Sequence, residues 1–422
     1  MIEYALNLIM KNGMDGIVSN EKSIEKQVKF YNGKVEIIKE WDETILKIFM
    51  ARKNKKIFFN VDNPTKAKIR EAIERNMKIL NIVSPSEYHG IQDKRNYVNR
   101  KKFDGRVIDS NAMVRIAEDA ISQNAKAGIV FSSIYEKEIA NSNGVTEKDR
   151  NSMIYLSARA FYRNSSMHDV SCSRSIEGID SSIAENAYET AKKAGKARRI
   201  KEGKYDVIFY PMAFANLMAS VASFASAFYV DAGYSFLADK LNKKVGSDAL
   251  TIYDDGTLYD GIASQKFDDE GNATQATCII ENGILKSYLH NSTTASKYNT
   301  ITTGNAGIVA PHPWNVFVEK GSFGIEQMME GFEGIIITNV WYTRFQNYRN
   351  GDFSTVARDA IFRVDKKGMH AVKGIRISDN MQRILENIEM LSKQQKQIFW
   401  WEVETPVFSP YAMVKDVSIT TP

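Results

Sequence analysis

The feature that most constrains the fold is a run without a formal charge that extends from Val207 to Val230. It begins with apolar and aromatic residues as far as Tyr210, which are typical of a buried strand. Pro211 then favours the start of a helix, and the rest of the run is rich in Ala and Ser with Asn216 inside it. Ala and Ser contribute little to transfer into a bilayer. The run therefore predicts a buried strand followed by a buried helix rather than a membrane span.

The composition is that of a globular chain with more than one domain. Of the 422 residues, 43% are hydrophobic and 25% are charged, which are typical values for folded proteins. The 56 basic and 51 acidic residues give a net charge of +5 and are spread along the chain. We interpret the short basic run at Arg198, Arg199 and Lys201 as a solvated helix end. We therefore expect no nucleic-acid partner.

The cysteines and the start of the chain indicate a compartment. Cys172 and Cys278 lie far apart and lack the spacing of a metal site. Two such cysteines do not make a disulfide framework, which favours a reducing environment. Glu3 stands where a signal peptide has basic residues, and no cleavage site follows it. We expect a cytoplasmic protein without a membrane partner.

Residues 1–85 predict an α+β unit made of a helix, two hairpins and a second helix. The first helix is expected over residues 3–11. Asn32–Gly33 is the strongest short signal for a hairpin turn, and the second hairpin is expected around residues 53–55. Pro64 favours the start of the second helix.

Residues 104–200 predict a middle α+β unit, which a charged and aperiodic stretch at 86–103 joins to the first. Helices are expected over residues 110–125 and 181–196. The strands between them turn at Asn143–Gly144.

Residues 203–422 predict a β-rich C-terminal domain. A hairpin is expected to turn at Asn282–Gly283, which has the sequence of a type I′ turn. Helices are expected over residues 212–230 and 381–391. Further strands are expected at 251–253, 316–318, 334–340 and 412–420. The predicted fold class is therefore α+β, with N-terminal units of helices and antiparallel strands followed by a β-rich C-terminal domain.

A series of short blocks between about Ser235 and Asn387 carries a family resemblance. The blocks are YSFLA at 234–238, DDG at 254–256, FDDEG at 267–271, YLHN at 288–291, TGNA at 303–306, GDFS at 351–354 and ISDN at 377–380. In this order they resemble the C-terminal region of the TldD/PmbA family, also called modulators of DNA gyrase. A weaker similarity extends over the first 200 residues. The chain is identified as a PmbA-like (TldE-like) member.

The resemblance implies that zinc is bound by another subunit. TldD-type members carry zinc on a helix with the motif His-Glu-x-x-x-His, in which two imidazoles hold the metal and the Glu handles the proton of the attacking water. The matching positions here are Ala219, Ser220 and Phe224, and Glu404–Phe408 stands where the family has a Cys ligand. The resemblance therefore implies no catalytic residue, metal ligand or cofactor in this chain, and zinc only in a TldD-like partner.

Two acidic turns are candidates for chemistry of their own. Paired carboxylates can serve as acid and base or bind a hard cation. Asp and Gly are also the natural residues of tight turns, and we interpret these turns as structural. Their residues are Asp254, Asp255, Gly256, Asp268, Asp269 and Glu270.

An amide-rich group of residues is a candidate for peptide contact. Its side chains could hydrogen-bond the backbone of an extended peptide. Buried Asn residues also cap loops, so the structural alternative stays open. The residues are His290, Asn291, Thr303, Gly304 and Asn305.

Three functions remain open. The leading hypothesis is the non-catalytic subunit of a TldD-like zinc metallopeptidase complex that degrades or processes unfolded peptides, as a heterodimer with a His-Glu-x-x-x-His subunit. The first alternative is a homodimeric peptide-binding protein without a proteolytic role. The second is a hydrolase that uses the acidic turns.

Overall fold

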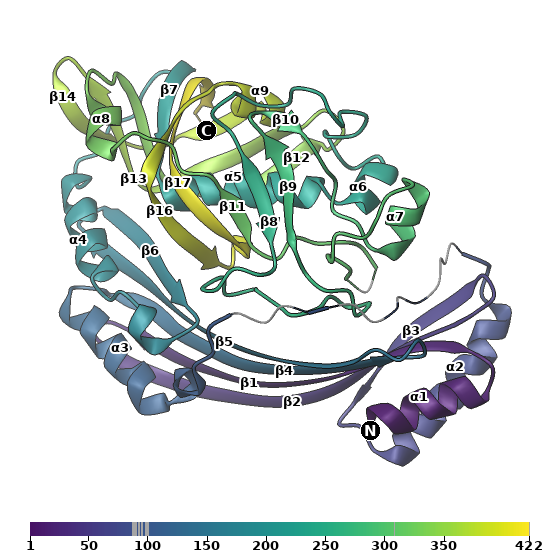
Figure 1. Cartoon of the computed structure of the whole chain (residues 1–422). Helices are drawn as coiled ribbons and strands as arrows, with labels where there is room; N and C mark the ends of the chain where they lie inside the picture. Colours follow the sequence, from purple (N-terminus) through teal and green to yellow (C-terminus); the bar gives the residue numbers. More distant parts are fainter. Residues whose placement is uncertain (87–90, 92, 94–95, 98–100, 308, 422) are drawn as a thin grey trace.

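The computed structural model describes residues 1–86, 91, 93, 96–97, 101–307 and 309–421, and the strands in these ranges form two sheets. The N-terminal sheet contains β1 (Asp15–Tyr31), β2 (Lys34–Arg52), β3 (Lys55–Asp62), β4 (Ala127–Asn141), β5 (Thr146–Tyr162) and β6 (Ser165–Ser173). It is antiparallel, with the order β3-β2-β1-β4-β5-β6. Figure 1 shows it as a long curved layer below the C-terminal domain.

One strand pairing joins two parts of the chain that the sequence predicts as separate units. β1 pairs with β4 along its length, with Ile17 opposite Asn141. Residues 1–85 and 104–200 therefore contribute three strands each to the same sheet. Pairing between strands so distant in the chain depends on non-local contacts. Local residue patterns do not predict such contacts.

Helices cover the two ends of this sheet, each over its own core. They are α1 (Ile2–Lys11), α2 (Lys66–Ile82), α3 (Ser110–Ser122) and α4 (Ile183–Lys193), with 3-10 turns at Gly105–Ile108 and Ile176–Gly178. At one end, Ile9 of α1 and Ile73 of α2 are buried with Leu46 of β2. At the other end, Met113 of α3 is buried with Phe30 of β1. Figure 1 shows both groups of helices at the ends of the curved layer.

The C-terminal domain is built on a larger sheet. Its strands are β7 (Gly203–Phe209), β8 (Ile252–Asp255), β9 (Ala276–Glu281), β10 (Ile284–Leu285), β11 (Val316–Val318), β12 (Gly334–Asn347), β13 (Asp352–Asp365), β14 (Gly368–Val372), β15 (Arg376–Asn380), β16 (Ile388–Trp400) and β17 (Val403–Thr420). Their order is β10-β9-β8-β11-β17-β15-β13-β12-β7, with β14 beside β13 and β16 beside β17. β7 also pairs with β17, which closes the second half of this order into a ring. The fold is therefore α+β, as predicted.

The uncharged run lies at the centre of this domain, as a strand and a helix. It starts as β7 and continues as α5 (Pro211–Phe224), in which Met212 to Met218 are all buried. α5 packs against β17 and β12, and Figure 1 shows it across the middle of the domain. The shorter helices are α6 (Ala227–Asp231), α7 (Ser292–Lys297), α8 (Ile325–Met329) and α9 (Met381–Glu386). Within the described ranges, no helix is long and apolar enough to cross a membrane.

Two helices predicted for the C-terminal domain are interrupted or end early, because strand contacts replace part of each helix. The helix expected over residues 212–230 is interrupted at Ser226, whose backbone forms a bridge with Leu289. The helix expected over residues 381–391 ends at Glu386, because the chain after it pairs with β17 as β16. Both predictions were wrong at the point where tertiary pairing overrides the helical pattern.

Candidate functional site

The first acidic turn belongs to the buried interior of the C-terminal domain. Asp254 is fully buried in β8, and its carboxylate accepts hydrogen bonds from the Trp314 N–H and the Asn305 side-chain amide, both at 2.6 Å. Burial raises the pKa of Asp254 to about 7. The Asp255 carboxylate accepts bonds from the N–H and the hydroxyl of Thr257, each at 2.7 Å. These bonds fix the local backbone.

The second acidic turn is also committed to internal bonds. Asp268 is fully buried, and its carboxylate accepts from the Glu270 N–H at 2.9 Å and the Ala306 N–H at 3.0 Å. Burial raises the pKa of Asp268 to about 7. Asp269 forms an ion pair with Lys137 of β4, so this turn connects the C-terminal domain to the N-terminal sheet.

The amide-rich residues lie between the two turns. Asn305 bonds to the first turn, and the N–H that follows it bonds to the second. The Asn291 side chain caps α7 by accepting from the Thr294 N–H at 2.9 Å. The His290 N–H donates to the Thr303 hydroxyl at 2.8 Å, and burial lowers the pKa of His290 to about 4. This segment therefore holds the two turns together.

Two glycines of the predicted site have no room for a side chain. A Cβ atom at Gly256 would lie 2.6 Å from the Cβ of Thr274. A Cβ at Gly304, where φ is +69°, would lie 2.3 Å from the carbonyl oxygen of Ala273. Both glycines are therefore explained by packing.

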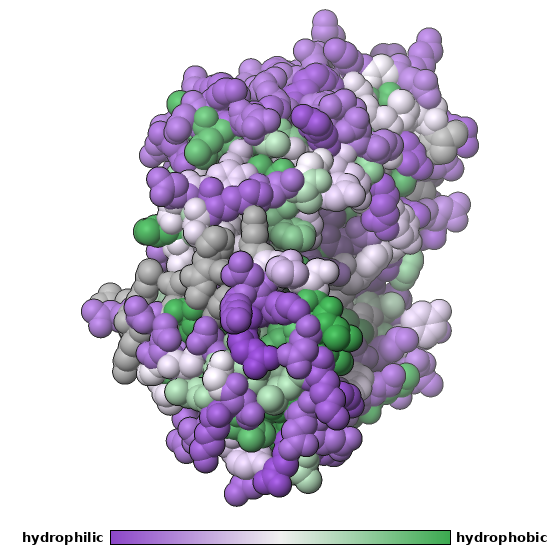
Figure 2. Space-filling model, turned by 90° about the vertical axis from the view of Figure 1, so that its right-hand side faces the viewer, coloured by the Kyte–Doolittle hydropathy of each residue, from purple (hydrophilic) through white to green (hydrophobic). Residues whose placement is uncertain are grey.

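The structure thus brings the sequence-predicted residues together in one network, but most of them face inward. Asp269, Glu270 and Asn291 also line a pocket of about 790 Å³ between the two domains, which we call the interdomain pocket. Its opposite wall includes Phe49 of β2 and Phe58 of β3. Figure 2 views the molecule from this side and shows apolar residues between the N-terminal layer and the C-terminal domain.

A second pocket of about 790 Å³ lies over α5, and we call it the α5 pocket. Asn216, Ala219, Ser220, Ser223 and Phe224 form its floor, since this spacing places them on one face of the helix. Its walls come from β12, from the segment around α6, and from the turn between β16 and β17. The positions that the resemblance aligns with the zinc motif therefore lie in one cavity.

The walls of the α5 pocket are aromatic. Phe345 stacks on Tyr348 with ring centres 5.9 Å apart, and Tyr234 meets the edge of Tyr348 at 5.8 Å. Tyr234 is 56% exposed, Tyr348 is 47% exposed, and Trp401 on another wall is 56% exposed. Exposed aromatic groups that cluster around a cavity are typical of a binding site.

Two carboxylates complete the pocket. Glu402 and Glu404 lie on the same side of β17 and its turn, with the buried Val403 between them. The Glu402 carboxylate accepts from the Tyr342 N–H at 3.1 Å. Tyr342 has φ of +60°, a strained conformation for an aromatic residue, at a point where the pairing of β12 with β13 is irregular.

The α5 pocket does not fit a zinc ion. A protein zinc site uses about three or four ligands from Cys, His, Asp and Glu side chains. At the aligned positions the α5 face offers a methyl group, a hydroxyl and a phenyl ring, from Ala219, Ser220 and Phe224. Glu402 and Glu404 are the lining residues of ligand type, and Glu402 already accepts a backbone N–H.

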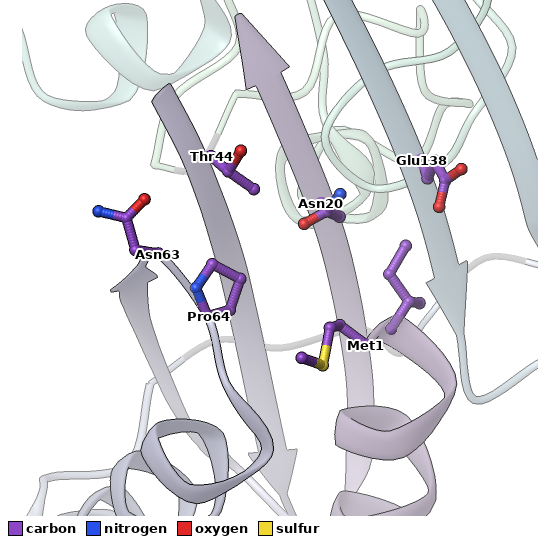
Figure 3. A pocket seen from close by; sticks show the side chains of 7 residues that line it. Met1, Asn20, Thr44, Asn63, Pro64 and Glu138 are labelled. Atoms are coloured by element: carbon purple, nitrogen blue, oxygen red, sulfur yellow. The ribbon is translucent and has the colours of Figure 1, made fainter. Parts of the chain in front are cut away.

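A smaller hollow of about 440 Å³ lies at the start of α1. Figure 3 shows Asn20 of β1 between Thr44 of β2 and Glu138 of β4, with Met1 below them. Its polar groups come from separate strands, and we assign it no function.

Sequence reasoning located α5 but missed the aromatic walls of its pocket. A signal was available in WYTRFQNY at residues 341–348, where four of eight residues are aromatic, and in the pair Trp400–Trp401. Such residues are more often buried in a core, so the signal becomes specific only when their exposure is known.

Two family models match this chain. The central domain of the PmbA/TldA metallopeptidases matches residues 67–196, and their C-terminal domain matches residues 202–421. Two crystal structures match over 99% of both chains: a protein named as a modulator of a DNA gyrase from Thermotoga maritima, with a TM-score of 0.89 and 23% identity, and TldE from Thermococcus kodakarensis, with 0.88 and 21%. At this identity the two structures support the fold.

Sequence relatives agree with the family models. The metalloprotease PmbA homolog of Haemophilus influenzae is 25% identical over 414 residues, which are 92% of this chain and 89% of that protein. Metalloprotease MJ0996 of Methanocaldococcus jannaschii is 36% identical over 162 residues, which are 37% of this chain and 36% of that protein. The match to MJ0996 thus spans about a third of that protein's length. The match to MJ0231 from the same organism spans 61% of that protein's length. Because the C-terminal model alone spans half of the sequence, the chain belongs to the PmbA/TldD metallopeptidase family, as a PmbA/TldE-like member.

Proposed function

We propose that this chain is the non-catalytic subunit of a TldD-like zinc metallopeptidase complex that processes unfolded peptides. The observation that carries the proposal is the α5 pocket. Residues from both regions that correspond to the zinc site line one cavity: Ala219 and Ser220 on α5, and Glu404 from the segment Glu404–Phe408. Their side chains do not make a zinc site. The cavity is present and its metal chemistry is not, which fits a subunit that binds peptide for a partner.

The partner in this proposal is a TldD-like subunit with the His-Glu-x-x-x-His motif. It would supply the zinc and the Glu that handles the proton of water. This chain would complete the chamber and position the peptide. We expect the interface to bury more than roughly 2,000 Å², as is usual for subunits that share a reaction chamber.

The two alternatives differ in their support. The hydrolase alternative needs free carboxylates in the acidic turns. Asp254 and Asp268 instead accept hydrogen bonds at both of their oxygens, so the geometry does not favour it. The homodimeric peptide-binding alternative shares the pocket with the leading proposal and differs in the partner.

The test is to measure zinc content and peptide hydrolysis for this chain alone, for a TldD-like relative from the same source alone, and for their mixture. We expect stoichiometric zinc in the relative, none in this chain, and efficient hydrolysis in the mixture. Zinc-dependent cleavage by this chain alone would contradict the proposal. A stable homodimer that does not associate with the relative would favour the peptide-binding alternative.

A further inference from the structure

The hydrogen-bonding groups on the floor of the α5 pocket are mainly acceptors. The Ser220 hydroxyl donates to the Asn216 carbonyl at 3.1 Å, and the Ser223 hydroxyl donates to the Ala219 carbonyl at 2.9 Å. A hydroxyl has one proton to donate, so the remaining lone pairs of both oxygens can accept from a ligand. These hydroxyls therefore fit a ligand that brings donors.

The charged residues of the α5 pocket also favour a ligand that brings hydrogen-bond donors and positive charge. Two carboxylates, Glu402 and Glu404, stand against one guanidinium, that of Arg344. Arg344 donates to the Thr343 carbonyl at 2.9 Å, and its guanidinium lies 6.0 Å from the ring centre of Tyr342. This cation is thus held by its own strand, and among the described residues neither glutamate has an ion-pair partner.

The aromatic walls fit the same kind of ligand. The electron-rich face of a Tyr or Trp ring attracts a cation and also packs against the methylene groups that carry it. Tyr234, Tyr348 and Trp401 are each about half exposed at the pocket, so their rings are accessible. A long side chain that ends in a positive charge would satisfy the rings and the carboxylates together.

We infer that the α5 pocket binds a lysine or arginine side chain of an extended peptide. The aliphatic stem lies against the aromatic walls, and the charged end meets Glu404 and Glu402. This inference rests on the proposed function, because it names the class of peptide that the chain holds for its partner. The region that corresponds to the family's zinc site would then be a site that selects basic residues.

The experiment is equilibrium binding to the isolated chain of short blocked peptides that differ at one central residue: Lys, the neutral norleucine of similar length, or Glu. We expect the Lys peptide to bind about tenfold more tightly than the norleucine peptide, as a cation–π contact and exposed ion pairs together allow. We expect the Glu peptide to bind most weakly. The preference for Lys should decrease with salt, because the carboxylates are accessible to solvent.

Variants locate the effect in the pocket. Glu404→Gln should remove most of the preference for Lys, and Trp401→Leu should weaken binding of the Lys peptide about threefold or more. Glu402→Gln is less direct, because Glu402 also holds the Tyr342 N–H. The matched control is Glu74→Gln on the exposed face of α2, which should change nothing.

Three results would overturn the inference: equal binding of the Lys and norleucine peptides, no binding of any peptide, or an unchanged preference in Glu404→Gln. Partner-dependent hydrolysis without a preference for Lys would overturn this inference and leave the proposed function intact. Binding that prefers the Lys peptide, without partner-dependent hydrolysis, would overturn the proposed function and leave this inference intact.

Discussion

The side chains of Asn305 and Asp254 are joined by a hydrogen bond of 2.6 Å, and both are fully buried. The residues come from distant parts of the C-terminal domain, a loop and strand β8. The Asn305 amide also donates to the His312 carbonyl at 2.9 Å. A buried carboxyl is stable only if its oxygens have partners, so this pair contributes to the positioning of the loop.

Burial of Asp254 predicts a dependence of stability on pH. Its pKa is raised to about 7 in the folded chain, whereas an Asp in the unfolded chain has a pKa of about 3.9. Between these values the folded state holds a proton that the unfolded state has released. The stabilising contribution is therefore complete below about pH 4 and is lost as the pH rises to about 7.

Asp254→Asn removes this titration. We compare the loss in the free energy of unfolding between pH 4.5 and pH 7, measured by urea unfolding. This loss should be smaller in the variant than in the wild type, by about 1–3 kcal/mol. Asp248→Asn changes a carboxylate that is 91% exposed and is the matched control. It should keep the wild-type dependence. Identical slopes for Asp254→Asn and the wild type would contradict the prediction.

The elements predicted correctly from the sequence have signals contained in a few consecutive residues. The turns at Asn32–Gly33 and Asn282–Gly283 both form, and each has positive φ at both positions. The uncharged run begins as a strand and a buried helix, as its apolar residues and Pro211 predict. These local signals do not depend on the rest of the fold.

The candidate site was less predictable, because it depends on contacts between distant segments. Ser220 on α5 and Trp401 in the turn between β16 and β17 line the same pocket, although their positions in the chain give no sign of it. The His290–Asn305 group was predicted as a peptide-contact candidate, and its polar atoms are largely used inside the protein. Exposure, which distinguishes a binding group from a core group, is a property of the folded chain.

Two hairpin glycines allow strain and crowding to be separated. Gly283 has φ of +74°, and a Cβ there would lie 2.2 Å from the Gly246 carbonyl oxygen. Gly33 has φ of +81°, but a Cβ there would meet nothing within 4 Å. Gly33→Ala should therefore lower the free energy of unfolding by about 1 kcal/mol, through backbone strain. Gly283→Ala should lower it by about 3 kcal/mol or more, because neighbouring backbone must also move.

Thermal and urea unfolding of the two Ala variants would measure this difference. Both substitutions place the same methyl group at a glycine with positive φ in a similar turn. The cost of the backbone conformation is therefore common to both variants, and the difference between them reports the crowding. Equal losses of stability would contradict the close approach of the Gly283 turn to Gly246.

The buried ion pair between Lys137 and Asp269 predicts a larger effect than exposed pairs on the same strand. The Lys137 side chain is 3% exposed and its amine also lies 3.9 Å from Glu21. Lys137→Met leaves the Asp269 carboxylate without its main partner at the junction of the two domains. The free energy of unfolding should fall by about 3–5 kcal/mol.

Lys148→Met is the matched control, because Lys148 pairs with Glu138 where both side chains are exposed. It should change the free energy of unfolding by less than about 1 kcal/mol. In the double variant Lys137→Met/Asp269→Asn, no charged carboxylate is left at position 269, so part of the stability should return. Urea unfolding of the four proteins, including the wild type, checks these statements. A loss in Lys137→Met as small as that in the control would mean that the Asp269 turn does not couple the C-terminal domain to the N-terminal sheet.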